Sequence, residues 1–440
     1  MLQCVIGLLI LIALILAGVP IAFAFSVGAL FMIFTLGYDP AFLLPYSFRR
    51  LDSLVLMCMP FFILAGNIME KGGITEPLVD FVGALISRVR GGLGAIGVIT
   101  NAIFGAISGS SFAAISCIGP IMIPPMEREG YPRGYATSLM TSAAGIANLI
   151  PPSILLILYG WLSDTSVTAC FLAGMLPGIL LMAIFIVINW IMVGKMPVTK
   201  ERRPQSSIRQ IGRQVAHTGW RAFPALTMPV FVLGTIYGGI ATPTEAAAAS
   251  IFYAALLGFL VYRKLTPRSF VSALVEGGGT VGSIMVMLFF AMMLGRIFVM
   301  ERIPDQVAAL MLGISQNKYV VLLMCNIIII IFGMFIDDTS CMIISACLLV
   351  PVGIEIGVNP VHLSVILTTN IMMGCYTPPM APMLYIGQRV GKTTFPEMFR
   401  TSMMLVVCGY LPTLLLVTYW PPLSLWLPKL VLGAKVLGLS

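Results

Sequence analysis

Charged residues are scarce in this sequence. They make up 10% of its 440 residues, whereas 59% are hydrophobic, and an ordinary soluble domain carries about 25% charged residues. Many apolar runs reach the roughly 17 to 25 residues that a helix needs to cross a bilayer. The composition therefore excludes a soluble globular protein and predicts an all-α polytopic membrane protein embedded in the lipid bilayer.

Metal-ligating motifs are also missing. The chain has only two histidines, His217 and His362, and its nine cysteines form no C-x-x-C pair. Most of the cysteines lie inside apolar segments, where they pack as small hydrophobic residues. We therefore expect no zinc or iron–sulfur site and no organic cofactor.

Nucleic-acid binding is a further class that the sequence argues against, in spite of a formal net charge of +8. The basic residues stand in short loops between apolar segments, as is typical of cytoplasmic loops, and they are not interleaved with aromatic residues as in RNA-binding surfaces.

The N-terminus has neither a basic n-region nor an A-x-A site, so we expect the first apolar stretch to stay in the mature protein.

The longest polar stretch, 195–221, divides the chain nearly in half. It carries seven Lys and Arg residues against Glu201 alone, and this positive charge indicates a cytoplasmic connector lying on the membrane surface. It separates a first half, 1–194, from a second half, 222–440. The apolar segments are 2–36, 54–70, 93–125, 134–162 and 167–194, then 223–241, 244–262, 278–299, 319–351, 361–388 and 402–420, with 74–90 as an amphipathic surface helix.

The second half repeats the frame of the first. The separation between Pro124 and Pro351, which we call the repeat interval, recurs at several other pairs of like residues. If Gly18-Val19-Pro20 divides 2–36 into two helices, each half has five crossings and one segment that enters and leaves on the same side. An odd number of crossings inverts one half relative to the other, so we predict an inverted-topology repeat. The other matching positions are Gly130 and Gly357, Pro151-Pro152 and Pro378-Pro379, Gly160 and Gly387, and Ser110-Ser111 and Asp337-Asp338.

The predicted fold follows from this repeat. It has about ten crossings and two re-entrant hairpins, at about 93–125 and 319–351. The segments 134–162 and 361–388 are predicted to be broken helices. The basic loops place the N-terminus outside.

The polar cluster Ser108-Gly109-Ser110-Ser111 interrupts the first hairpin segment at its middle. Non-helical backbone at membrane depth must be buried in protein or line a cavity, because lipid cannot bond its free N–H and C=O groups. Such a turn offers hydroxyls and carbonyls to a small cation and helix N-termini to a carboxylate. The break at Pro151-Pro152 adds the carbonyls of 145–149, since proline removes an N–H donor.

The second copy carries Asp337-Asp338, the only charges between Lys318 and Glu355. A carboxylate inside a membrane costs roughly 2.5–3.5 kcal/mol on the most lenient scale, so it is functional or paired by default. Gly374 and Thr377, before Pro378-Pro379, supply matching oxygens. An oxygen-only site favours Na⁺ over a transition metal, and a protonated Asp remains the alternative.

Structural readings compete with these functional ones. Small residues allow close helix packing, and a proline pair kinks a helix, but two polar turns each followed by a proline pair favour function. Thr242 and Glu245 are typical of a helix N-cap. Arg296, near the end of an apolar helix, either meets a solute carboxylate or extends to the interface, and we favour the interface.

At these motifs the chain resembles the DctM-like family, the large membrane subunit of tripartite ATP-independent periplasmic (TRAP) transporters. The resemblance runs nearly the whole length in order, with departures at Ala147 and at Met380-Ala381-Pro382, where glycines are usual. The motifs are Gly105-x-x-Ser-Gly-Ser-Ser111, Gly130-Tyr131, Leu149-Ile-Pro-Pro-Ser153, Thr242-Pro-Thr-Glu-Ala246, Gly333-Met-Phe-Ile-Asp337, Asn359-Pro-Val-His362 and Thr377-Pro-Pro379.

The resemblance implies an elevator-type transporter of the bacterial inner membrane. A transport domain of both hairpins and both broken helices moves against a scaffold made by the rest of the chain. The family uses a Na⁺ gradient, pairs with a small four-helix membrane subunit, and receives an organic acid from a periplasmic solute-binding protein.

Carried onto this sequence, the resemblance also implies site residues. We expect no cofactor besides Na⁺ as the coupling ion, and we expect the solute to bind beside the ions. The predicted Na⁺ ligands are Ser108, Ser111, Gly145, Asn148, Pro151, Asp337, Gly374 and Thr377, and the predicted solute contacts are Ser110, Ser153, Asp338, Pro379 and Arg296.

Other functions remain as alternatives. A stand-alone H⁺- or Na⁺-coupled anion transporter needs no partner subunits, and a passive channel needs no inverted hairpins. An intramembrane aspartyl protease is disfavoured, because adjacent helical residues such as Asp337 and Asp338 point about 100° apart. We therefore expect a transporter and not an enzyme.

Overall fold

The structure, a computed structural model, describes residues 2–86, 91–196 and 208–433. All regular secondary structure in these residues is helical, and seven of their helices are long and apolar enough to cross a membrane. The predicted all-α, multi-pass class is therefore confirmed. Breaks at glycine and proline divide other apolar segments into helices of 10–17 residues, so the predicted ten crossings stay a prediction.

The first half of the chain forms ten α-helices and one 3₁₀ turn in its described residues. They are α1 (Leu2–Leu16), α2 (Ile21–Leu36), α3 (Pro40–Leu51), α4 (Leu54–Lys71), α5 (Thr75–Ile86), α6 (Gly92–Ser108), α7 (Ser111–Arg128), α8 (Arg133–Ala144), η1 (Gly145–Asn148), α9 (Ile154–Leu162) and α10 (Val167–Val193).

The second half, over the part that the structure describes, forms eleven α-helices, two of them continued by a π-helical turn. They are α11 (Ile208–Tyr237), α12 (Pro243–Leu256) with η2 (Leu257–Val261), α13 (Pro267–Met300), α14 (Ile303–Ile314), α15 (Lys318–Phe335), α16 (Asp338–Glu355), α17 (Pro360–Cys375), α18 (Pro382–Gly391), α19 (Phe395–Leu405) with η3 (Val406–Tyr410), α20 (Leu411–Tyr419) and α21 (Pro422–Leu432).

Helices of the two halves begin in register with the sequence repeat. The first residues of α7 and α16, directly after the two polar turns, are separated by the repeat interval, and so are the last residues of α6 and α15. The same interval also separates the first residues of helices whose sequences are not obviously alike. It relates the first residues of α3 and α13, Pro40 and Pro267, and those of α8 and α17, Arg133 and Pro360.

Local chemistry explains where the helices end. Gly18 has a φ of 82° between α1 and α2, a conformation that glycine adopts without steric cost, so 2–36 is two helices. Thr242 caps α12 in a capping box with Glu245, as its sequence predicts.

Several boundaries differ from the sequence predictions. α11 begins at Ile208, so the end of the predicted connector is already helical, and Pro224 and Pro229 lie inside that helix without ending it. The short helices α3, α14 and α21 were missed, because none is a membrane-length apolar run. The basic residues Lys200, Arg202, Arg203, Arg88 and Arg90, on which the topology partly rests, lie outside the described residues.

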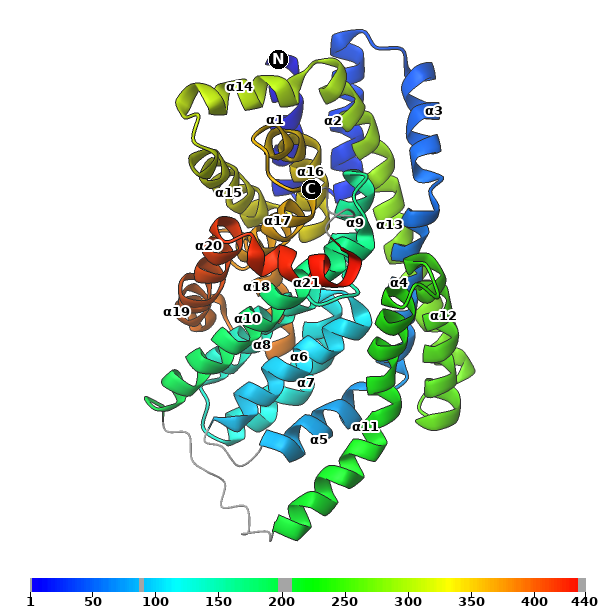
Figure 1. Ribbon diagram of the computed structural model, residues 1–440, viewed down its shortest axis with the longest axis vertical. Helices are drawn as coiled ribbons and strands as arrows, with labels where there is room; N and C mark the ends of the chain where they lie inside the picture. Colours follow the sequence, from blue (N-terminus) through cyan, green and yellow to red (C-terminus); the bar gives the residue numbers. More distant parts are fainter. Residues whose placement is uncertain (1, 87–90, 197–207, 434–440) are drawn as a thin grey trace.

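The helices pack as two groups (Figure 1). In the framework group, α1–α4 and α11–α13, α4 packs on both α12 and α13, and α13 also packs on α2 and α3. In the hairpin group, α6–α10 and α15–α20, the first hairpin is α6 and α7 and the second is α15 and α16. The two hairpins occupy opposite halves of the view in Figure 1, so their tips meet between them.

Candidate functional site

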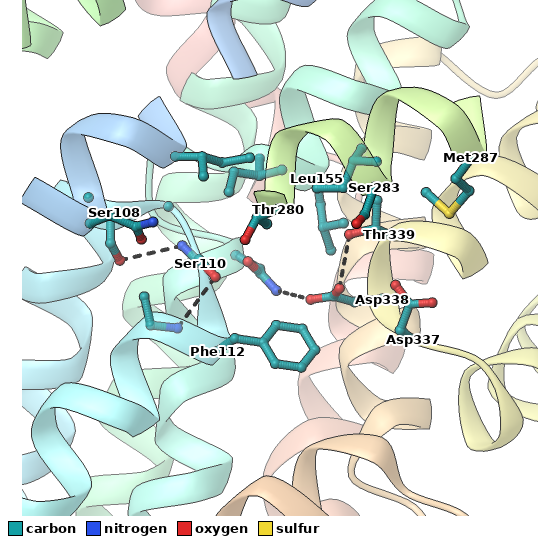
Figure 2. Close-up of a pocket in the computed structure, with 18 of the residues that line it drawn as sticks. Ser108, Ser110, Phe112, Leu155, Thr280, Ser283, Met287, Asp337, Asp338 and Thr339 are labelled. Carbon is teal, nitrogen blue, oxygen red and sulfur yellow. Dashed lines mark hydrogen bonds between the residues drawn. The ribbon is translucent and has the colours of Figure 1, made fainter. Parts of the chain in front are cut away.

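A cavity of about 660 Å³ lies where the two hairpin tips meet the framework group. The hairpin side contributes Ser108, Ser110, Asp337, Asp338 and Thr339, with Asn148 and the start of α9. Figure 2 shows Ser108 and Ser110 on one side of it and Asp337 to Thr339 on the other. The framework side contributes Pro20 to Phe23, Ile63, Gly66, Asn67, Glu70, Thr280, Ser283, Ile284 and Met287.

Each hairpin tip is a helix break closed by an N-cap. In the first, Gly109 has a φ of 64° and the Ser110 hydroxyl accepts the backbone N–H of Ala113. In the second, the Asp337 carboxylate accepts the N–H of Ser340 at 3.3 Å. Each cap satisfies one N–H, whereas the first N–H groups of a helix all lack partners within that helix. Residues of the first turns of α7 and α16 line the cavity.

The two tips are joined through the Asp338 carboxylate. Its Oδ2 accepts the Ser111 hydroxyl at 3.3 Å and the Asn148 side-chain amide at 3.0 Å, and Asn148 also donates to Ser111 at 3.2 Å. Ser111 and Asp338 are equivalent positions of the repeat, 227 residues apart. The two halves of the chain therefore touch at equivalent positions of the sequence repeat.

The Asp337 carboxylate keeps one oxygen free. Its Oδ2 caps α16, whereas its buried Oδ1 has no hydrogen-bond partner. A buried carboxylate oxygen without a partner is costly unless a cation or water occupies the space beside it. The carboxyl groups that line the cavity are those of Glu70, Asp337 and Asp338, and no Lys, Arg or His among the described residues lines it. The cavity is therefore suited to a cation.

Backbone contacts lock each hairpin tip to a helix break at one of the proline pairs, 151–152 and 378–379, both of which carry cis peptide bonds. Ile154 donates its N–H to the Gly109 carbonyl at 3.2 Å. Ala381, the position equivalent to Ile154 in the repeat, donates to the Met334 carbonyl at 3.1 Å. One backbone bond in each half thus ties the hairpin to the helix break that follows it in the chain.

In each half, a glycine also allows the backbone of the hairpin to approach the backbone of the broken helix closely. A Cβ on Gly105 would meet the Ala147 Cα at 2.4 Å, and a Cβ on Gly374 would meet the Gly333 Cα at 2.7 Å. Ala147 and Gly374 are equivalent in the repeat, so the departure at Ala147 is accommodated because Gly105 leaves room for its methyl group.

Five predicted site residues line the cavity together: Ser108, Ser110, Asn148, Asp337 and Asp338. Ser111 is fully buried behind them and bonds Asp338. The remaining predicted residues do not line it, and three of these lie in contacts within the protein. The Ser153 hydroxyl donates to the Asn148 carbonyl at 2.6 Å, the Thr377 hydroxyl donates to the Met373 carbonyl at 2.6 Å, and Gly145 packs under Tyr410 and Tyr376.

The other predicted solute contacts are also placed elsewhere. The Arg296 guanidinium lies over the rings of Phe42 and Tyr46 on α3, 5.8 and 5.2 Å from their centroids. Arg296 is not among the residues that line the cavity, so the structure does not bring it together with Ser110 and Asp338, the predicted solute contacts that do. Pro151 and Pro379 shape the breaks but are not among the residues that line the cavity.

Sequence reasoning missed the framework side of the cavity. Thr280, Ser283 and Met287 lie on one face of α13, and Asn67 and Glu70 on one face of α4. A signal was present, because polar residues recur in these apolar helices at spacings of three and four, which is one helical face.

Interrupted helices around a polar cavity in an otherwise apolar chain define a class of protein, the helical membrane transporters. Within that class, the family model of the tripartite ATP-independent periplasmic transporter, DctM component, matches residues 8–423. The chain belongs to this family, which confirms the resemblance carried by its motifs. The family consists of transporter permeases and not enzymes, so the protease alternative is rejected.

Relatives of similar length support this membership. The chain is 33% identical to the sialic acid TRAP transporter large permease protein SiaM of Vibrio cholerae, covering 96% of this chain and 97% of that protein. It is 33% identical to the C4-dicarboxylate TRAP transporter large permease protein DctM of Pseudomonas aeruginosa, covering 87% and 88%.

A further relative is longer than this chain. The isethionate TRAP transporter permease protein DctMQ of Oleidesulfovibrio alaskensis is 33% identical over 93% of this chain, which spans only 64% of that protein. Among solved structures, the YdaH transporter of Alcanivorax borkumensis matches with a TM-score of 0.60 at 15% identity, covering 88% of this chain and 91% of that one. This likeness concerns the fold alone.

Proposed function

We propose that this chain is the large membrane subunit of a TRAP transporter that couples Na⁺ entry to the uptake of an organic acid across the bacterial inner membrane. The observation that carries the proposal is the pair of carboxylates, Asp337 and Asp338, where two hairpins at equivalent positions of the sequence repeat meet. Two relatives of similar length are large permeases named for sialic acid and C4-dicarboxylates.

The donor set supports Na⁺ as the coupling ion. The free Oδ1 of Asp337, the hydroxyls of Ser108 and Ser110 and the carboxamide of Asn148 are hard oxygen donors, which suit an alkali cation better than a transition metal. A bound cation also offsets the cost of keeping two carboxylates together in an apolar protein.

The helix termini support an organic anion as the solute. Three helices, α7, α9 and α16, begin at the cavity. Each N-terminus carries a positive partial charge and unpaired N–H groups. A solute carboxylate bound at these ends is held without any basic side chain, and the Na⁺ ions supply the charge balance.

The two helix groups support an elevator-type movement. Hairpins and breaks are locked together by backbone bonds, so they move as one body, the transport domain. The framework group serves as the scaffold, and the inverted repeat provides two equivalent arrangements of one domain against the other. The relative DctMQ extends beyond the region that this chain matches, which supports a small membrane subunit as partner beside a periplasmic binding protein.

The experiment is uptake into liposomes that contain this chain and its small membrane subunit, with binding protein added outside. Sialic acid, succinate and isethionate are supplied in turn, with an inward Na⁺ gradient, a choline control, or an inward pH gradient without Na⁺. We expect uptake of one solute only with Na⁺. Uptake driven by the pH gradient alone would establish H⁺ coupling instead, and uptake indifferent to both gradients would establish a channel.

A further inference from the structure

A second cavity, of about 850 Å³, shares no lining residue with the first. It lies where the α3–α4 junction and the α11–α12 turn of the scaffold meet the α9–α10 turn of the transport domain. The scaffold contributes Arg49, Arg50, Asp52 to Val55, Cys58 and Thr242 to Glu245, and the transport domain contributes Gly160, Trp161 and Asp164 to Thr168.

Arg50 bridges the two domains across this cavity. Its Nη2 lies 3.8 Å from Oδ2 of Asp164, and its guanidinium carbon lies 6.0 Å from the centroid of the Trp161 ring. Both partners belong to the end of α9 and the turn after it, whereas Arg50 belongs to α3. The Glu245 carboxylate, which lines the same cavity, caps α12 by accepting the backbone N–H of Thr242 at 2.8 Å, and among the described residues the ion pair of Arg50 is with Asp164.

The contact is weak enough to open. Asp164 has a side-chain exposure of 80% and Arg50 of 37%, and exposed ion pairs stabilise a structure by roughly 0–1 kcal/mol. The buried Nε of Arg50 has no hydrogen-bond partner, which further limits the gain. A contact of this strength raises the population of one arrangement of transport domain and scaffold but still allows the domains to leave that arrangement.

The repeat makes this contact one-sided. The positions equivalent to Arg50 and Asp164, one repeat interval later, are Gly277 and Gly391. In the opposite arrangement of the two domains, α13 and the α18–α19 turn take the places of the α3–α4 junction and the α9–α10 turn. Both equivalent positions are glycines, which carry no charged side chain, so they cannot form the equivalent ion pair.

We propose that Arg50, with Asp164 and Trp161, is a one-sided latch that favours the present arrangement of transport domain and scaffold. The inference rests on the proposed elevator movement. Arg50 is a positioning residue in it and touches neither ion nor solute. Its cation–π contact with Trp161 adds to the ion pair, so removing the guanidinium weakens the latch more than removing the Asp164 carboxylate.

The test measures the distance between the domains in liposomes. Spin labels are placed at Arg268→Cys on α13 and Arg400→Cys on α19, both exposed positions, with exposed Cys408 replaced by Ser. The distance between the two labels is recorded with and without Na⁺, and we expect two values of it, one for each arrangement of the domains. We expect Asp164→Asn to lower the ratio of the present to the opposite arrangement about two- to fivefold, Arg50→Gln to lower it further, and the exchanged pair Arg50→Asp with Asp164→Arg to restore it.

Arg49→Gln is the matched control, because Arg49 lines the same cavity and forms no ion pair with a described residue. An unchanged ratio in Asp164→Asn, or an equal shift in Arg49→Gln, would overturn the latch. A single distance under every condition would instead overturn the elevator movement itself. Should Asp164→Asn fold poorly, the exchanged pair still decides, since only a charge contact predicts its rescue.

Discussion

Asp338→Asn separates the charge of the site from its packing. The carboxamide has the shape of the carboxylate, and Asp338 is only 4% exposed, so no cavity or overpacking results. The amide oxygen still accepts from Asn148 and Ser111, which donate to the carboxylate at 3.0 and 3.3 Å. What disappears is the negative charge and the extra strength of two charge-assisted bonds.

The size of the effect follows from two opposing contributions. Charge-assisted bonds contribute about 1.5–3 kcal/mol each, against about 0.5–1.5 kcal/mol for neutral ones. The loss is offset because a buried carboxylate also costs several kcal/mol of desolvation. Without Na⁺ we therefore expect the variant to be at least as stable as the parent. With Na⁺ at 100 times its dissociation constant the parent gains about 2.7 kcal/mol, and the variant gains little.

Thermal unfolding of the purified protein in detergent measures this difference. NaCl is compared with choline chloride at equal ionic strength, so that general salt screening cancels. The matched control is Asp305→Asn, which removes an exposed carboxylate from the first turn of α14 and keeps the Na⁺ response. A Na⁺-dependent rise in Tm that is unchanged in Asp338→Asn would refute the proposal that the negative charge of Asp338 supports Na⁺ binding beside the Asp337 carboxylate.

Three further substitutions are informative. Two of them, Gly374→Ala and Ser153→Ala, test the packing around the site, and the third, Tyr38→Phe, tests a contact far from it. Gly374→Ala places a methyl group 2.7 Å from the Gly333 Cα and is expected to lower the free energy of unfolding by about 1–3 kcal/mol, measured by denaturation in detergent. Ser153→Ala removes the N-cap of α9 and is expected to cost about 1 kcal/mol, with weaker Na⁺ binding, because the break loses its anchor. Tyr38→Phe removes the 2.6 Å bond that Tyr38 donates to Glu301, at about 1 kcal/mol. The Glu301 carboxylate raises the pKa of Tyr38 from its ordinary value to about 12, so this stability is present below about pH 10 and is lost as the pH rises through about 12.

Each of these expectations has a contrary outcome. Ala147→Gly removes a methyl group at the position equivalent to Gly374, so it creates space where Gly374→Ala fills it. An equal decrease in the free energy of unfolding for both variants would contradict the conclusion that Gly374 is required for close contact with Gly333. Ser163→Ala removes an equally small hydroxyl at the other end of α9, and a loss of Na⁺ binding there would show that the Ser153 effect is not specific. Equal pH dependence in Tyr38→Phe and the parent between pH 10 and 12 would exclude Tyr38 as its source.

Much of the fold could be predicted from the sequence, because a bilayer imposes strict length and polarity requirements. Apolar runs such as 167–194 became helices with nearly the predicted ends. Thr242 formed the expected N-cap, with Glu245 in the first turn, and the structure shows that the two close a capping box, a local interaction of neighbouring residues. The short helices α3 and α14 could not be found this way, since their stability depends on neighbouring helices rather than on apolar length.

The site was only partly predictable. The hairpin tips stood out because Ser108 and Asp337 are polar residues in apolar surroundings. Thr377 and Ser153 lie beside the predicted breaks, yet their hydroxyls donate to backbone carbonyls of the protein, and Gly145 is not among the residues that line the cavity. The direction of a side chain depends on how its helix is rotated in the fold, and motif spacing does not record it.

By itself the sequence determined the class of protein, the repeat and the two polar breaks, because composition, a constant repeat interval and glycine–proline chemistry are properties of the chain. Only the tertiary structure decided that Ser111 and Asp338 touch, that α4 and α13 complete the cavity, and that Arg50 reaches across to Asp164. These are contacts between residues far apart in sequence. They depend on the packing of one half of the molecule against the other, which no local pattern encodes.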